Sequence, residues 1–77
     1  MEAEALRYER MALTALARRE MCDEDFRTLF DGKTDTFLFW MRLNALVLRK
    51  YVSAKRDKSG KYIFRITTAG HKYLSEL

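Results

Sequence analysis

Two alternating segments around a short polar turn constrain the fold of this chain more than any other feature. Apolar and polar side chains alternate in Val52–Arg56 and again in Lys61–Thr67, and Asp57-Lys58-Ser59-Gly60 separates the two segments. A period of two residues is typical of β-strands, and a polar segment ending in glycine favours a tight turn. We therefore predict a hairpin with strands at Tyr51–Lys55 and Lys61–Ile66. The side chains expected on its core face are Val52, Ala54, Tyr62, Phe64 and Ile66.

The segment before the hairpin predicts three helices. Strong helix formers fill residues 2–19, and Asp23 can cap a second helix that ends near Phe30. A third helix is expected from a cap at Thr34 or Asp35 to about Arg49, after a short break of the kind that a helix-turn-helix requires. In the first helix, the expected core face holds Leu6, Leu13, Leu16 and Ala17, and a weaker apolar strip holds Tyr8, Met11 and Ala15. A second strip indicates wider burial or a partner.

Motifs on both sides of the hairpin carry a resemblance to a known family. A helix end of the form L-x-x-L-x-x-x-G-L-V is matched, with Lys50 at the usual glycine, by Leu43, Leu46, Tyr51 and Val52. A closing motif of the form L-T-x-x-G-x-x-x-L is matched by Ile66, Thr67, Gly70 and Leu74. The chain thus resembles the winged helix-turn-helix domains of small MarR-like and PadR-like regulators. The resemblance implies one α+β winged-helix domain over residues 1–77, with three helices, a two-stranded hairpin as the wing, and a short C-terminal helix.

Basic charge is concentrated in the second half of the chain. Residues 1–38 carry six Lys/Arg against nine Asp/Glu, whereas residues 39–77 carry nine against two. A one-sided basic balance is the pattern expected of a surface that binds phosphates, because counterion release supplies much of the affinity for nucleic acid. The alternative is a small domain whose basic residues are only solvated.

The candidate DNA contacts lie on the wing and on the third helix. The wing cations, which can reach duplex phosphates, are Lys55, Arg56, Lys58 and Lys61. Lysines at a hairpin tip also protect an exposed edge, which is the structural alternative for this cluster. Contacts from the start and flank of the third helix are expected from Lys33, Thr34, Thr36, Arg42 and Asn44.

The third helix is unusually apolar for one that reads a DNA groove. Its expected core face holds Thr36, Phe39, Leu43, Leu46, Val47 and Lys50, and the opposite face holds Phe37, Leu38, Met41, Ala45 and Leu48. Base edges are read by side chains such as Arg, Asn and Gln, which this face supplies sparsely. The helix is therefore either buried on both sides, by a different packing or by a dimer, or it presents a patch to another protein. A third alternative is stacking of Trp40 and Phe37 on single-stranded bases.

Catalysis, metal binding and membrane insertion are not indicated. Cys22 is the one cysteine and His71 the one histidine, and neither has partners at the spacing of a catalytic or zinc site. Gly32-Lys33-Thr34 lacks the rest of a phosphate-binding loop. The longest apolar run, Phe37–Met41, is too short for a bilayer, and the first twenty residues are too charged for a signal peptide. We expect a cytoplasmic protein without a cofactor and without enzymatic activity.

These features together predict a small DNA-binding protein. The function expected is that of a transcriptional regulator that contacts duplex DNA through its basic wing, as a homodimer. The alternative is a winged-helix module for protein–protein interaction. Its contact surface would hold Phe37, Leu38, Met41 and Leu48.

Overall fold

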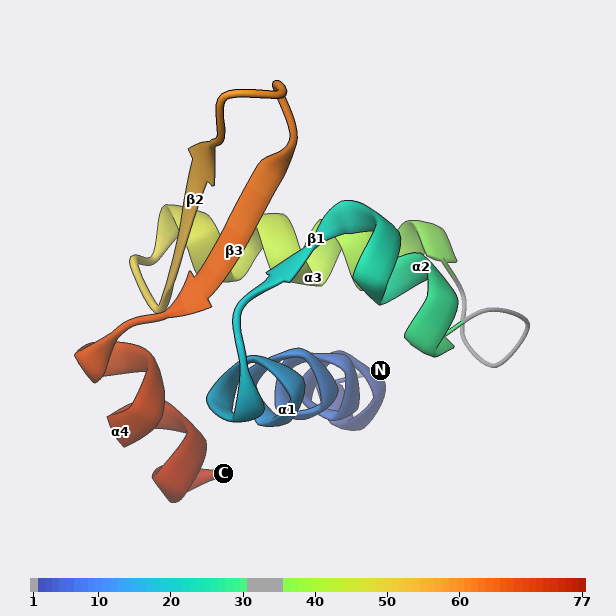
Figure 1. Cartoon of the computed structure of the whole chain (residues 1–77). Helices are drawn as coiled ribbons and strands as arrows, with labels where there is room; N and C mark the ends of the chain where they lie inside the picture. Colours follow the sequence, from blue (N-terminus) through green and yellow to red (C-terminus); the bar gives the residue numbers. More distant parts are fainter. Residues whose placement is uncertain (1, 31–35) are drawn as a thin grey trace.

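The structure is α+β. The computed structural model describes residues 2–30 and 36–77. In this part of the chain, four helices and a three-stranded antiparallel sheet follow one another (Figure 1). In chain order they are α1 (Glu2–Arg18), β1 (Met21–Cys22), α2 (Asp23–Phe30), α3 (Thr36–Leu48), β2 (Val52–Arg56), β3 (Tyr62–Ile66) and α4 (Thr68–Glu76). The predicted helices and hairpin are therefore present. The caps expected at Thr34 or Asp35 lie outside the described residues.

The hairpin forms most of the sheet. β2 and β3 pair antiparallel as predicted, with Val52 opposite Ile66 and Ala54 opposite Phe64. The strand order is β1-β3-β2, so β1 lies on the free edge of β3, where Met21 faces Phe64. β1 was not predicted from the sequence, because a strand of two residues is too short to show an alternating pattern.

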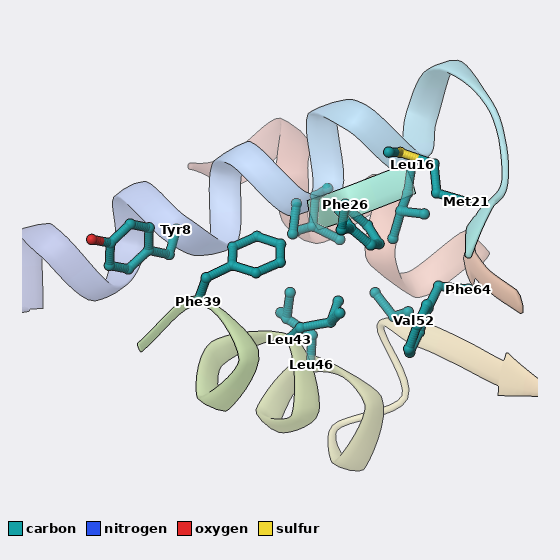
Figure 2. Close-up of a cluster of buried hydrophobic side chains, with 11 residues drawn as sticks. Tyr8, Leu16, Met21, Phe26, Phe39, Leu43, Leu46, Val52 and Phe64 are labelled. Carbon is teal, nitrogen blue, oxygen red and sulfur yellow. The ribbon is translucent and has the colours of Figure 1, made fainter. Parts of the chain in front are cut away.

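The core lies between α1, α3 and the sheet (Figure 2). α3 contributes Phe39, Leu43 and Leu46, which are buried as their helical spacing predicted, whereas Thr36 and Lys50 of the predicted core face are exposed. Phe26 of α2 lies at the centre, 1% exposed, with its ring centroid 5.3 Å from Phe39 and 5.9 Å from Phe64. This aromatic cluster joins the second and third helices to the hairpin.

The predicted core face of α1 was only half correct. Leu13 and Leu16 are buried, but Leu6 is 43% exposed and Ala17 also faces solvent. The helix is turned so that Tyr8 and Ala12, from the other side of the expected face, are buried. Glu9 is buried beside them, at 3% exposure. Burial of this charge is tolerated because its carboxylate accepts a hydrogen bond from Tyr73 of α4 and forms an ion pair with Arg42 of α3.

The predicted burial of Tyr62 was wrong. Its side chain is 45% exposed, whereas Phe64 is buried and Ile66 is half-buried. Tyr62 pairs with Arg56 at the far end of the hairpin, beyond the core. The Arg56 guanidinium lies over its ring, 5.1 Å from the centroid. The ring therefore contacts an exposed cation at the hairpin end.

The junctions at both ends of the hairpin follow from local backbone chemistry. Lys50 adopts a φ of 68° just after α3, a left-handed conformation that explains why the related motif favours glycine there. Thr67 caps α4: its hydroxyl oxygen accepts the Gly70 N–H at 3.0 Å, and its hydroxyl donates to the Lys50 carbonyl at 2.8 Å. The end of α3 and the start of α4 are thereby linked.

Candidate functional site

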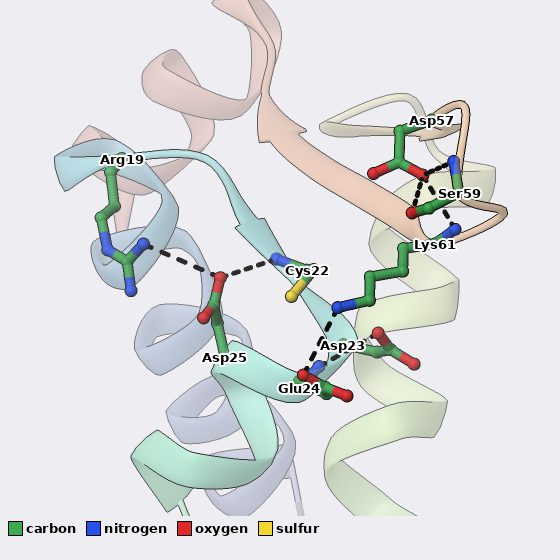
Figure 3. Close-up of polar contacts among 8 residues, drawn as sticks. All are labelled: Arg19, Cys22, Asp23, Glu24, Asp25, Asp57, Ser59 and Lys61. Carbon is green, nitrogen blue, oxygen red and sulfur yellow. Dashed lines mark hydrogen bonds and ion pairs between the residues drawn. The ribbon is translucent and has the colours of Figure 1, made fainter.

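The turn of the β2–β3 hairpin is organised by one carboxylate. The Oδ1 atom of Asp57 accepts hydrogen bonds from the Ser59 N–H at 2.9 Å, the Ser59 hydroxyl at 2.7 Å and the Lys61 N–H at 3.0 Å (Figure 3). These donors, the Ser59 hydroxyl first among them, lower the pKa of Asp57. Gly60 supplies the positive φ, 87°, that the turn requires. The carboxylate of Asp57 is therefore engaged by hydrogen-bond donors of its own turn.

Three of the four predicted hairpin cations project into solvent. Lys55, Arg56 and Lys58 are all exposed. Lys61 differs, because its Nζ lies 3.6 Å from Oε2 of Glu24 and so connects the hairpin to α2 (Figure 3). An exposed ion pair of this kind contributes little to stability, but it reduces the positive charge that Lys61 can offer to a ligand.

The candidates on α3 are less favourable for DNA contact. Arg42 points towards α1, where its Nη1 lies 3.8 Å from Oε2 of buried Glu9, so its charge is already compensated. Thr36 and Asn44 are exposed. Lys33 and Thr34 lie outside the described residues.

The outward face of α3 is apolar and in contact with solvent. Phe37 is 73% exposed, Leu48 82% and Met41 45%, whereas Leu38 is partly buried against the core. The hypothesis that a different packing within the chain buries this face was therefore wrong. The dimer and the second protein remain as explanations.

Trp40 packs against the aromatic core. It is half-buried, and its ring makes contacts with Phe26 at 6.2 Å, Phe39 at 5.5 Å and Phe64 at 6.5 Å between centroids. These are distances of ordinary aromatic packing. Of the two rings proposed to stack on single-stranded bases, Phe37 is exposed, whereas Trp40 is mostly packed within the protein.

A polar cluster around the buried side chain of Glu9 was not predicted from the sequence. Oε1 of Glu9 accepts a hydrogen bond from the Tyr73 hydroxyl of α4, and Oε2 lies 4.0 Å from Nη1 of Arg49. The rings of Tyr51 and Tyr73 stack at 4.4 Å, with the Arg49 guanidinium over both. The position of Glu9 next to Tyr8 on an otherwise apolar helix face is the one signal that could have indicated it. The cluster fixes α1, α3 and α4 to one another.

This cluster predicts a distinctive titration of Tyr73. The hydrogen bond to Glu9 raises the pKa of Tyr73 above its ordinary value. The bond therefore stabilises the fold fully below about pH 10, and this contribution is lost as the pH rises through the folded pKa. Absorbance of tyrosinate should show one late phase that is absent from Tyr73→Phe, and that variant should lose about 1–2 kcal/mol of stability at neutral pH. A variant with the full late phase would contradict the assignment.

The described residues hold little that indicates other chemistry. Among residues 2–30 and 36–77, no group of three His, Cys, Asp or Glu side chains could hold a metal ion. Cys22 lies on β1, where its N–H donates to Asp25 at 3.1 Å, and His71 is exposed on α4. A groove of about 650 Å³ between α1 and α2 has a mainly apolar lining that includes Met11 and Met21. Across the same described ranges, no helix has the length and apolar character needed to cross a bilayer.

Comparison with known proteins leaves the chain without an assigned family. No protein-family model matches its sequence, and neither the curated proteins nor the solved structures contain a significant match. The function has therefore to be argued from the chemistry of the surfaces described above.

Proposed function

We propose that the chain is a winged-helix protein that binds duplex DNA through phosphate contacts and acts in the cytoplasm as a transcriptional regulator. The observation that carries this proposal is the hairpin end, where Lys55, Arg56 and Lys58 are exposed. Its one carboxylate, Asp57, is engaged by turn donors. Cations held at a preorganised turn suit an anionic, extended ligand such as a phosphate backbone.

The arrangement of the elements supports this proposal. α2 and α3 follow one another in the chain, as in a helix-turn-helix, and the hairpin follows α3 directly. The hairpin turn extends away from α1 and α4, so its cations lie at an extremity of the molecule (Figure 1). A duplex can approach this end without meeting those two helices.

The expected binding depends weakly on DNA sequence. Phosphate contacts position a protein on a duplex but carry little sequence information. Asn44, on the outward face of α3, is an exposed side chain suited to adenine, and Thr36, exposed at the start of the helix, is a weaker candidate. Counterion release from the wing is therefore the main source of affinity.

We expect a large loss of DNA affinity when the exposed cations of the wing are replaced by alanine. The triple variant Lys55→Ala, Arg56→Ala, Lys58→Ala should bind an unrelated duplex about two orders of magnitude more weakly near 0.1 M salt. The log–log salt slope should fall by about 0.9 for each lost contact. Fluorescence anisotropy titrations at several salt concentrations measure both quantities. The thermal midpoint should not change, because the turn is held by Asp57 and backbone groups.

A matched variant separates the wing from net charge. Arg7→Ala, Arg18→Ala, Lys72→Ala also removes three exposed cations, but from α1 and α4, away from the hairpin turn. It should retain most of the affinity. Equal losses in the two variants would reduce the proposal to nonspecific attraction by net charge, and unchanged affinity in the folded wing variant would remove DNA binding from the wing.

Protein–protein interaction is the second candidate function. It is favoured by the exposure of Phe37 and Leu48 on α3, the helix that a DNA-reading domain would place in the groove. The anisotropy titration with duplex DNA discriminates the two functions, because a protein-interaction module should show no strong DNA binding that weakens with salt.

A further inference from the structure

The outward face of α3 carries a straight stripe of exposed side chains. Phe37, Met41, Asn44 and Leu48 are all exposed, and their spacings of four, three and four residues place them in one line along the helix. This is the spacing of the contact positions in a two-helix coiled coil. The stripe is thus shaped to pack along a second helix.

The helix that carries the stripe contributes almost no charge. In Thr36–Leu48 the one charged residue is Arg42, and it turns towards Glu9 of α1. A chain with a formal net charge of +4 repels its own copies over most of its surface, but this face adds no repulsion. An uncharged apolar face suits another apolar protein surface and offers nothing to DNA phosphates.

The stripe is also complementary to itself. Its four positions are symmetric about the midpoint between Arg42 and Leu43, so an antiparallel copy places Phe37 opposite Leu48 and Met41 opposite Asn44. A two-fold axis through this midpoint generates both halves of the contact at once. We propose that α3 is the interface of an antiparallel homodimer, with the stripe of one copy packed on the stripe of the other.

The size of the face sets the strength of this dimer. Stable interfaces bury roughly 800 Å² on each partner. A helix of 13 residues is about 20 Å long and 10 Å wide, so the projected area of this face is about 200 Å², a quarter of that value. The dimer is accordingly weak, with a Kd on the order of 100 μM. In it α3 faces the second copy, and duplex contact is left to the two wings.

Sedimentation velocity over a wide concentration range tests the proposal. The wild-type chain should change from monomer to dimer, and Leu48→Glu should raise the Kd at least ten-fold because it places a carboxylate in the seam. Leu48 is 82% exposed in the monomer, so the substitution should leave the fold intact. Leu29→Glu is the matched control: Leu29 is also exposed, at 46%, but it belongs to α2.

Disulfide trapping then tests the antiparallel register, with Cys22→Ser as the background. A Phe37→Cys chain mixed with a Leu48→Cys chain should form a crosslinked heterodimer. Leu48→Cys alone should not, because the two position-48 residues are about 16 Å apart along antiparallel helices and a disulfide requires Cα atoms within about 7 Å. Efficient crosslinking of Leu48→Cys alone would overturn the antiparallel arrangement.

The remaining outcomes each decide the proposal. A wild-type chain that stays monomeric up to ~1 mM, well above the expected Kd, would overturn it and leave the stripe for a different protein. A dimer unaffected by Leu48→Glu, or equally weakened by Leu29→Glu, would place the interface elsewhere. The test is independent of DNA, so it can succeed or fail whatever the wing binds.

Discussion

Replacing Phe26 by alanine should lower the free energy of unfolding by about 3–5 kcal/mol. The side chain is 1% exposed and touches the rings of Phe39, Trp40 and Phe64, so its removal opens a cavity between α2, α3 and the hairpin. A domain of this length has a total stability of about 4–12 kcal/mol. The Phe26→Ala protein should therefore lose a large share of its stability and unfold at a much lower urea concentration.

The same substitution on the surface provides the control. Phe37 is 73% exposed, and Phe37→Ala should change the stability by no more than about 0.5 kcal/mol. Urea denaturation followed by circular dichroism, at about 1 μM protein, compares the two variants where the proposed dimer is dissociated. Similar midpoints for both variants would show that Phe26 is not the centre of the core.

Gly70→Val should be the second most damaging change, with a loss of about 3 kcal/mol or more. A Cβ built at Gly70 would lie 2.1 Å from the carbonyl oxygen of Tyr51 and 2.8 Å from Cγ1 of Ile66. That carbonyl accepts the Thr67 N–H at 3.0 Å, so it cannot move without loss of a bond that holds the start of α4. The close approach, rather than backbone conformation, is what requires glycine here.

Ala69→Val separates this contact from helix propensity. Ala69 is exposed on the same turn of α4 and receives the same side chain, so it should lose only about 0.5 kcal/mol. Thermal unfolding of the two variants measures the difference. A Gly70→Val protein as stable as Ala69→Val would mean that α4 can shift away from Tyr51 at little cost.

Local features of the structure were predictable because their causes are local. The hairpin follows from alternation around Asp57–Gly60, and the start of α4 follows from a threonine whose hydroxyl can reach an N–H three residues on. The core face of α3 follows from its helical spacing. The exposed cations at the hairpin end follow from the same alternation and from their place beside the turn.

Features that depend on distant partners could not be predicted in this way. β1 exists because β3 has a free edge for it, and Tyr62 is exposed because the core ends before the hairpin does. The orientation of α1 depends on the hydrogen bond between Glu9 and Tyr73, which lies 64 residues later in the chain. Arg42 was predicted to contact DNA, because its ion pair with Glu9 is not apparent from the sequence.

The sequence by itself determined the helices, the two strands of the hairpin and the basic second half of the chain, because these properties depend on neighbours a few residues apart. The tertiary structure alone decided which cations remain available and which apolar face remains open. Burial and charge compensation depend on the three-dimensional surroundings of a side chain. Lys61 and Arg42 are compensated by carboxylates on α2 and α1, while Phe37 and Leu48 have no element packed over them among the described residues.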